Sequence, residues 1–289
     1  MDVSNHALPV SVIIPTWRRV DQLLDTLKRL QTYGADIAEI LVHVDAGDTE
    51  TAPALAAQFP SVQILTAEVT QGPGGGRNRL LKACSHPIVV SLDDDSYPID
   101  ADFFAKIRAA FGDNPDAGVL AMSIIHDDEP MIARHEGQRD VADFVGCGCA
   151  YRRAVFEAIP GYVPLHPAYG MEEADVALQV MDRGWRIVEC GTLRVRHATD
   201  RGHQTAPNIV AAHVRNTALL AFLRYPWQLA GYGAAQVLNR MVYSLRRGHV
   251  VGVLQGGAQI PATLWRHRRA RHVVQSETIL ARRRLRRNT

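Results

Sequence analysis

The chain has 289 residues, of which 47% are apolar and 21% charged, and a formal net charge of +2, as expected of a soluble globular protein with a sizeable core. No apolar run approaches the roughly 18 residues of a membrane-spanning helix, because Arg224 and Pro226 interrupt the best candidate, residues 217–238. The N-terminus lacks the basic and apolar regions of a secretory leader, and the four cysteines form no C-x-x-C pair. We therefore predict a cytoplasmic protein with reduced thiols.

Short apolar runs alternate with helical patterns through the first hundred residues, which predicts βαβ units and a mostly parallel sheet. Leucines at helical spacing follow Asp21, a candidate helix cap. The predicted strands are residues 10–15, 39–45, 62–67 and 87–93, and the further predicted helices are residues 52–58, 77–84 and 102–111.

Polar residues follow three of these strands. Thr16 and Arg18 follow the first, Asp45 ends the second, and Asp93, Asp94 and Asp95 end the fourth. Ligands of open α/β sheets bind in the crevice beyond the carboxyl ends of the strands. These side chains are therefore expected to line one crevice.

The aspartate triplet has two interpretations. Three ionised carboxylates side by side repel one another and resist desolvation, so they need water or a cation. The triplet is either a solvated turn or part of a metal site. Taken alone it favours the turn, because Asp is common in turns, so the rest of the chain must decide between the two.

A glycine-rich segment, "QGPGGGRNRLL", follows the third strand. With a helix opening at Arg77, such a loop would offer free N–H groups to a phosphate. It is neither a Walker A loop nor a dinucleotide fingerprint. A flexible turn is the alternative interpretation.

The second half contains two notable segments. "DFVGCGCAYRRAVF" packs small residues before a helix, and Cys147-Gly-Cys149 is either a pair of small buried residues or a metal-binding pair. A helix is predicted from Glu172 to Arg183, stopped at Gly184. Acidic residues at a helix start normally stabilise the positive end of the helix dipole. This role accounts for Asp175 and for one of the two glutamates, Glu172 and Glu173. It does not explain why all three acidic residues are present.

Beyond about residue 202 the sequence turns to helical, arginine-rich patterns. Residues 264–289 carry nine arginines and one glutamate, a local charge of +8 that leaves −6 for residues 1–263. We predict a helical extension over residues 206–289, with a tail that stands apart from the body and meets anionic lipid, nucleic acid or water. Aromatic residues beside arginines suit a peripheral membrane contact, and a lid or homodimer surface is the alternative.

The ordered motifs "SVIIPTWRR", "VDAGDTE", "GPGGGRNRLL", "VVSLDDDSYP", "VGCGCAYRR", "GMEEADVALQVMDRGW" and "VRHATDRG" resemble a family 2 glycosyltransferase of the GT-A fold, over roughly residues 9–203. The resemblance implies an α/β fold with a Rossmann-like, mostly parallel central sheet flanked by helices. It divides the transferase domain, residues 1–205, into a nucleotide-sugar half over about 9–100 and an acceptor half over about 101–205.

The resemblance also implies roles for single residues. Asp45 matches the carboxylate that reads the donor base, and Arg77 matches an arginine that faces the donor nucleotide. Glu173 stands in the place of the catalytic base, with Glu172 as its alternate. The implied donor-binding residues are Pro15, Thr16, Arg18, Asp45, Arg77, Asp93 and Asp94, and the implied metal-binding residues are Asp93, Asp95 and His197. Three residues depart from the family pattern without removing an essential charge, namely Ala46, Trp17 and Glu173.

The chemistry requires a base and a hard cation. Displacing a nucleoside diphosphate leaves negative charge on the leaving group, which Mg²⁺ or Mn²⁺ with oxygen ligands can stabilise. In an extended segment Asp93 and Asp95 point to the same side, so Asp94 should face solvent or a neighbouring loop and tolerate substitution. The acceptor hydroxyl must lose its proton to a carboxylate, for which Glu173 is the candidate.

We therefore expect an inverting transferase that moves a sugar from a UDP or dTDP donor, rather than GDP, to a glycan, lipid-linked or small-molecule acceptor in polysaccharide biosynthesis. A D-x-D phosphatase fits less well, because the motif follows the fourth strand and no Lys follows Lys106. A non-catalytic nucleotide-sugar-binding or membrane-surface module remains the alternative. A nucleic-acid binder is disfavoured by the acidic body.

Overall fold

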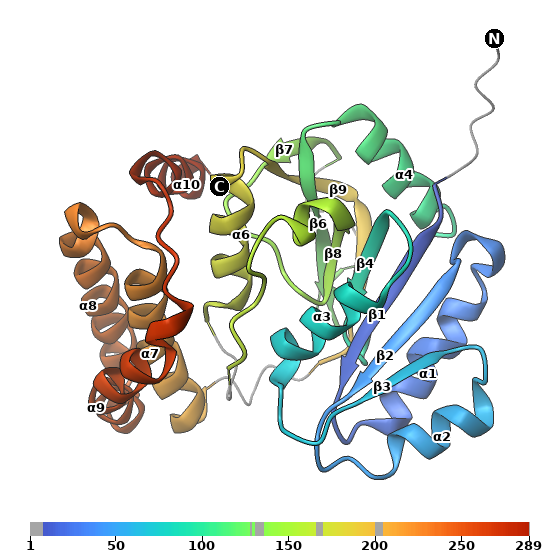
Figure 1. Ribbon diagram of the computed structural model, residues 1–289, viewed down its shortest axis with the longest axis horizontal. Coiled ribbons are helices and arrows are strands. Elements are labelled where there is room, and N and C mark those ends of the chain that lie inside the picture. Colours follow the sequence, from blue (N-terminus) through green and yellow to red (C-terminus); the bar gives the residue numbers. More distant parts are fainter. Residues whose placement is uncertain (1–7, 128, 131–135, 166–169, 200–204, 289) are drawn as a thin grey trace.

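The computed structural model describes residues 8–127, 129–130, 136–165, 170–199 and 205–288. A central sheet is covered by helices on both faces, and a group of C-terminal helices packs at one side (Figure 1). The strands are β1 (Val10–Thr16), β2 (Glu39–Val44), β3 (Gln63–Thr66), β4 (Ile88–Leu92), β5 (Ser96–Pro98), β6 (Ala117–His126), β7 (Gln138–Asp140), β8 (Gly148–Arg152) and β9 (Arg186–His197). The helices of the body are α1 (Val20–Gln31), α2 (Thr51–Gln58), α3 (Gly72–Ala83), α4 (Phe103–Asp113), α5 (Arg153–Glu157) and α6 (Glu172–Asp182).

The nine-stranded sheet has the order β3-β2-β1-β4-β8-β6-β9-β5, with β7 also paired to β9. The strands β3, β2, β1 and β4 are parallel, and β6 is parallel to β9, while β8 runs antiparallel between β4 and β6. The sheet is therefore mostly parallel, as predicted.

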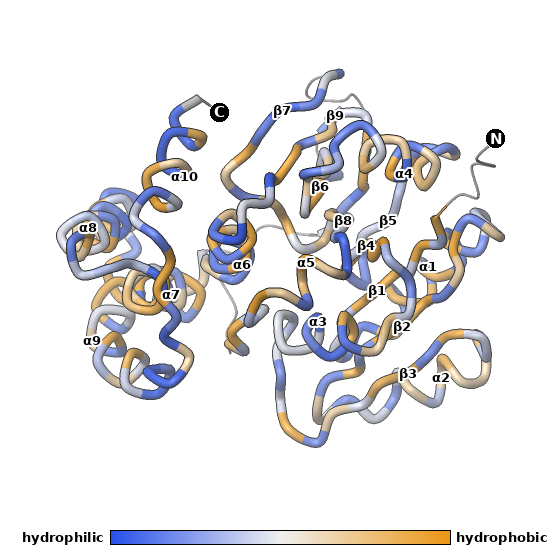
Figure 2. The backbone as a smooth tube through the Cα atoms, turned by 45° about the horizontal axis from the view of Figure 1, so that its top comes forward, coloured by the Kyte–Doolittle hydropathy of each residue, from blue (hydrophilic) through white to orange (hydrophobic). Residues whose placement is uncertain are grey.

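Alternate residues of each central strand pack into two separate hydrophobic cores, one on each face of the sheet. In β1, Val12 and Ile14 pack toward α1, α2 and α4, whereas Ile13 packs toward α3, α5 and α6. This two-residue period explains why β1 reads as a continuous apolar run, coloured as hydrophobic in Figure 2, since both of its faces are buried. The carboxyl ends of β1, β2 and β4 consequently meet at one edge of the sheet.

Two predicted boundaries are wrong. The glycine-rich segment is not a loop before a helix at Arg77, because α3 already begins at Gly72 and contains the glycines. Asp21 does not cap α1, which begins at Val20 without a side-chain cap.

The C-terminal helices are α7 (Pro207–Arg224), α8 (Ala230–Arg246), α9 (Val250–His267) and α10 (Ser276–Asn288). Helix α9 lies within the segment predicted to be helical, although it contains Pro261 and three glycines. The expected domain boundary, between residues 205 and 206, lies directly after residues 200–204, which are outside the described residues. Among the described helices, none is long and apolar enough to cross a membrane.

The extension does not stand apart from the body. Leu219, Leu223 and Ile279 share a hydrophobic core with Met171 and Leu178 around α6. The last helix is also held by polar contacts, because Asp182 of α6 accepts hydrogen bonds from the Gln275 backbone (2.8 Å) and from the Thr278 hydroxyl (2.8 Å).

Arginines of the predicted free tail are part of this contact. Arg282 is 4% exposed and forms an ion pair with Asp143 at 2.5 Å. Arg286 lies 3.5 Å from the other oxygen of the same carboxylate. The prediction of a detached basic tail is therefore wrong for α10, because burying these guanidinium groups beside a carboxylate attaches the helix to the body.

A buried ion pair joins α6 to α7. Asp175 is fully buried and Arg224 is 1% exposed. Their side chains form a two-point contact, in which Nη2 of Arg224 donates to Oδ2 of Asp175 at 2.9 Å and Nε donates to Oδ1. Gln179 also donates to Asp175 at 3.0 Å. Asp175 therefore serves the packing of the extension and not the helix dipole alone.

We predict that Asp175→Asn lowers the free energy of unfolding by about 3–5 kcal/mol, because it leaves the Arg224 guanidinium buried without its countercharge. Urea denaturation followed by circular dichroism would measure this. The control is Asp25→Asn, which removes an exposed i,i+4 pair with Arg29 and should cost less than about 0.5 kcal/mol. Equal losses in the two variants would contradict a special role for the buried pair.

Candidate active site

Asp45, at the end of β2, closes the N-terminus of α3. Its Oδ1 accepts hydrogen bonds from the Gln71 (2.8 Å) and Ala46 (2.9 Å) backbone, and its Oδ2 accepts one from the Gly72 backbone at 2.9 Å. A carboxylate here satisfies the free N–H groups and the positive end of the helix dipole. A phosphate was expected at the glycine-rich segment. At this helix start the carboxylate of Asp45 occupies that place instead.

The aspartate triplet forms a turn between β4 and β5. The Ser96 backbone donates to the Asp93 carbonyl at 3.1 Å, and the Ser96 hydroxyl accepts a hydrogen bond from the Asp93 backbone at 2.7 Å. The expectation of an extended segment is wrong, and the alternation that placed Asp93 and Asp95 on one side does not apply in a turn. Asp93 faces Arg77, while Asp94 and Asp95 both face Arg19.

Asp94 does not face solvent as predicted. It is 5% exposed, accepts a hydrogen bond from the Thr16 hydroxyl at 2.8 Å, and lies 3.1 Å from Arg19. Burial raises the pKa of Asp94 to about 7, against the opposing charge of Arg19. Because β1 and β4 are neighbouring parallel strands, their ends bring Thr16 and Asp94 together, and tolerance of substitution is no longer expected at Asp94.

Asp95 and His197 form a second buried contact. Nε2 of His197 lies 3.1 Å from Oδ1 of Asp95, and Arg19 donates to Oδ2 at 2.6 Å. Burial opposes ionisation of Asp95, but His197 and Arg19 outweigh it and lower the pKa of Asp95. Asp95 in turn raises the pKa of His197, although burial of the imidazole acts against this.

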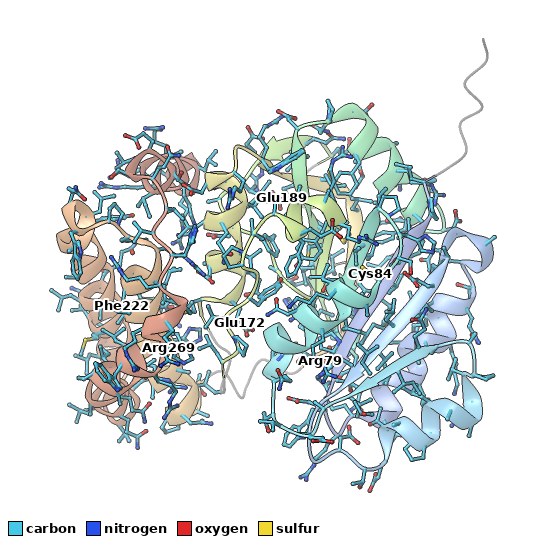
Figure 3. All side chains as sticks on the ribbon, viewed as in Figure 1. Arg79, Cys84, Glu172, Glu189, Phe222 and Arg269 are labelled. Atoms are coloured by element: carbon cyan, nitrogen blue, oxygen red, sulfur yellow. The ribbon has the colours of Figure 1, made fainter. Side chains whose placement is uncertain are left out.

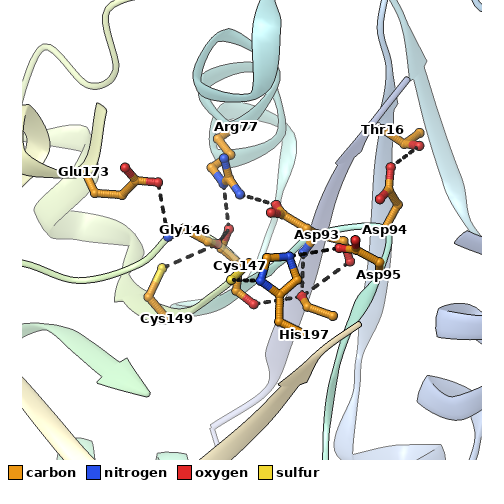
Figure 4. A network of polar contacts seen from close by, with 12 residues as sticks. Thr16, Arg77, Asp93, Asp94, Asp95, Gly146, Cys147, Cys149, Glu173 and His197 are labelled. Atoms are coloured by element: carbon orange, nitrogen blue, oxygen red, sulfur yellow. Dashed lines mark hydrogen bonds and ion pairs between the residues drawn. The ribbon is translucent and has the colours of Figure 1, made fainter. Parts of the chain in front are cut away.

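Three groups in this region could share a metal ion. One ligand atom each of Asp93, Cys147 and His197 lies within 4.8 Å of the others (Figure 4). Burial raises the pKa of Cys147 well above its ordinary value, so its sulfur is a protonated thiol, which is a weak ligand. The carboxylate and imidazole are therefore the better candidates, with Asp95 on the other side of His197. All four cysteines are free and buried, as expected for reduced thiols.

Arg77 connects the aspartate turn to α6. The Arg77 guanidinium is 3% exposed and donates to Asp93 and, at 3.0 Å, to the Ser91 hydroxyl. Ser91 donates to the Gly146 carbonyl at 2.8 Å, and the Gly146 backbone donates to Oε1 of Glu173 at 3.2 Å (Figure 4). The guanidinium expected to face the donor is thus turned to the interior, where it joins Asp93 and Glu173 in one charged network.

The two glutamates at the start of α6 have different surroundings. Glu173 is partly exposed, and burial raises its pKa although the charge of Arg77 opposes this. Glu172 is 3% exposed and points toward α3, where a Cβ at Gly74 would lie 2.4 Å from its Oε1 (Figure 3). Burial, together with the charge of Glu173, raises the pKa of Glu172 well above its ordinary value. Glu173 is therefore the more accessible carboxylate.

The remaining predicted donor residues lie at the end of β1. Pro15 is buried against α3, where a Cβ at Gly76 would lie 3.2 Å from its side chain. Arg18 is exposed, has a φ of 55°, and donates to the Gly47 carbonyl at 3.0 Å. Asp48 accepts the Arg18 backbone N–H at 2.6 Å, which holds this unusual conformation. The loops after β1 and β2 thus support each other.

Sequence reasoning missed three residues of this site, namely Arg19, Ser91 and Gly146. Arg19 follows Arg18 in "TWRR", shortly after β1. If β1 had been expected to lie beside β4, Arg19 could have been predicted to contact the aspartates that follow β4. Ser91 takes part through its hydroxyl group, and Gly146 through its backbone carbonyl and N–H. No sequence motif marks such contacts.

The family model of glycosyl transferase family 2 matches residues 11–159, which include β1 to β8 and the aspartate turn. The chain belongs to glycosyl transferase family 2. A search of the curated proteins finds no match. The matched residues contain Asp45, Arg77 and the aspartate turn but end before Glu173 and His197, which the fold adds to the site.

Solved structures with the same fold are GT-A glycosyltransferases. Mannosyltransferase PcManGT from Pyrobaculum calidifontis, in complex with GDP-Man and Mn²⁺, is 17% identical, with a TM-score of 0.60, over 89% of this chain and 80% of that one. S. aureus TarS 1-349 in complex with UDP-GlcNAc is 18% identical, with a TM-score of 0.60, over 81% of this chain and 72% of that one.

GalNAc-T7 with UDP, GalNAc and Mn²⁺ is 14% identical, with a TM-score of 0.61, over 77% of this chain. This chain spans about half of GalNAc-T7, 49% of its length. At these identities the likeness establishes the GT-A fold of this family member.

We predict that Gly146→Ala lowers sugar transfer at least about tenfold, because misplacing groups by about 1 Å costs up to a hundredfold. An added Cβ would lie 2.8 Å from both Arg77 Cζ and Glu173 Oε1. The control is Gly112→Ala in α4, where nothing lies within 4 Å and alanine favours the helix. Initial rates of both variants measure the effect, and an unchanged rate for Gly146→Ala would show that the network is not needed.

Proposed function

We propose that this protein is a metal-dependent, inverting glycosyltransferase that moves a hexosyl or deoxyhexosyl group from a nucleoside-diphosphate donor to a hydroxyl of its acceptor. The observation that carries the proposal is the network that links Asp93, at the aspartate turn, through Arg77 to Glu173. It sets a cation-binding carboxylate and a candidate base on either side of one buried positive charge. Transfer needs both groups, because the base takes the proton of the acceptor hydroxyl and the cation stabilises the leaving diphosphate.

Mg²⁺ or Mn²⁺ fits the available donor groups. Asp93 and His197 offer a hard oxygen and an imidazole ligand close to each other. Asp95, the third residue we assign to the ion, has its Oδ1 buried without a well-aligned hydrogen bond. A divalent cation here would displace the proton that Asp95 favours on His197. When bound, the ion supplies positive charge to the donor diphosphate as the sugar leaves. Mn²⁺ in the complexes of PcManGT and GalNAc-T7 supports this choice.

The residues of the chain can then carry the reaction. The partly exposed carboxylate of Glu173 takes the proton of the acceptor hydroxyl as its oxygen attacks the anomeric carbon. The bond from that carbon to the diphosphate oxygen breaks, and its electrons remain on the diphosphate. Arg77 holds Asp93 in place and, through its charge, keeps Glu173 more acidic than burial alone would. Attack from the side opposite the leaving group inverts the anomeric centre.

A pyrimidine donor, UDP or dTDP, is our proposal for the nucleotide. Asp45 keeps lone pairs available at the edge of the crevice, although three backbone N–H groups already bond to it. A glycan, a lipid-linked sugar or a small molecule would be the acceptor, in a cytoplasmic pathway of polysaccharide biosynthesis.

Donor binding tests the metal site. We expect a UDP- or dTDP-sugar with Mn²⁺ to raise the melting temperature, since ligand at a hundred times its Kd stabilises the fold by about 2.7 kcal/mol. EDTA or Asp95→Ala should abolish the shift, whereas Asp25→Ala should not. A thermal-shift panel of uridine, thymidine and guanosine diphospho-sugars measures it. A shift that survives both EDTA and Asp95→Ala would remove the metal from the proposal.

Two neighbouring substitutions test the base. Glu173→Gln should retain donor binding and lower transfer at least about a hundredfold, the usual contribution of a general base. Glu172→Gln should stay within about threefold of the parent rate, because Glu172 is buried against α3 and glutamine has nearly the same shape. Single-turnover transfer rates with saturating donor compare the two. A larger loss for Glu172→Gln would move the base to that residue, and no loss in either would favour a non-catalytic binding module.

A further inference from the structure

The buried side of α9 brings Gly252, Gly256 and Val253 against its neighbours, while other large apolar residues of the helix face outward. A Cβ at Gly252 would lie 2.6 Å from Val210, and one at Gly256 would lie 2.7 Å from the Ala211 carbonyl, so α9 packs closely on α7. On the outer side Leu254 and Trp265 are 67% and 69% exposed. A surface helix of a water-soluble protein normally carries polar residues on its outer side.

The exposed apolar residues form a continuous stripe. They follow one another at intervals of three or four positions, which places them on one side of a helix about 27 Å long. The stripe consists of Val251, Leu254, Ala258, Ala262 and Trp265, all exposed. Leu238 and Leu245 of α8 and Trp227 before it are exposed as well. An apolar surface of this extent marks a contact with something other than water.

Positive charge surrounds this stripe. Residues 201–276 contain ten arginines and no aspartate or glutamate. Arg246 and Arg247 precede α9, and three more arginines stand at positions 266, 268 and 269 at its other end. The guanidinium of Arg268 lies 3.9 Å from the centre of the Trp265 ring. Tryptophan beside arginine, with an apolar stripe between two basic ends, suits the boundary between lipid headgroups and acyl chains.

The contacts of α10 separate this surface from the basic tail. Arg282 and Arg286 are engaged with Asp143 of the body, so part of the charge of residues 264–289 is neutralised. The exposed apolar stripe with basic residues at both ends lies on α9, next to α8.

We propose that the outer face of α8 and α9 docks on an anionic phospholipid bilayer, with α9 lying in the interface along its apolar stripe. A second copy of this chain is the less suitable partner. Whichever way two α9 helices align, the arginines at their ends meet other arginines, and no carboxylate of residues 201–276 is there to compensate. The docking does not depend on sugar transfer, so either proposal can fail without the other.

Vesicle flotation of the full chain tests the proposal. The protein should float with vesicles of phosphatidylcholine and phosphatidylglycerol at least about tenfold better than with phosphatidylcholine alone, since anionic lipid attracts basic segments. Leu254→Glu and the double substitution Arg246→Glu/Arg247→Glu should each lower binding to the mixed vesicles at least about tenfold. Far-ultraviolet circular dichroism confirms that each variant is folded.

The matched control is Arg284→Glu/Arg287→Glu on α10, which changes the same amount of charge at two exposed arginines and should leave binding within about twofold. An equal loss in this control would assign the binding to overall charge and overturn the docking face. Equal binding to both kinds of vesicle would overturn the anionic partner. A dimer in sedimentation without lipid, abolished by Leu254→Glu, would assign the stripe to a second copy instead.

Discussion

The site depends on the burial of one arginine. A guanidinium out of water is tolerated only where countercharges and hydrogen-bond acceptors surround it. Arg77 finds these in Asp93, in the Ser91 hydroxyl and in the nearby charge of Glu173. Since these groups belong to α3, to the end of β4 and to α6, the requirement to neutralise Arg77 brings segments that are far apart in the sequence to one point.

Helix α6 connects the buried charge of the site to a second buried charge in the C-terminal helices. Its first turn carries Glu172 and Glu173 toward Arg77, and Asp175, in the same turn, faces the buried Arg224 of α7. One short helix thus lies between two buried arginines, one in the site and one in the extension. The position of the candidate base is therefore coupled to the packing of the C-terminal helices, although those helices contribute no residue to the network around Arg77.

The packing of α9 on α7 determines which of its residues are exposed. Gly252 and Gly256 of α9 allow its close contact with α7, while Leu254 and Trp265 remain exposed on the other side of the helix. Glycines and a proline in a helix interior normally argue against a helix, but two of the glycines of α9 allow its close packing on α7. A contact with lipid would make this exposed apolar surface favourable.

The sequence by itself determined the alternating strands and helices of the first hundred residues, the family, and the residues at the strand ends. These follow from local periodicity and from motifs that keep their spacing along the chain. Only the tertiary structure decided how the aspartates divide, with Asp93 facing Arg77 and with Asp94 and Asp95 facing Arg19. It also decided that Asp45 caps α3, that Glu172 is buried while Glu173 is accessible, and that α10 is attached to the body. The reason is physical: the direction of a side chain in a turn, and the partner of a buried charge, depend on which segments pack against it, and those segments lie far away in the sequence.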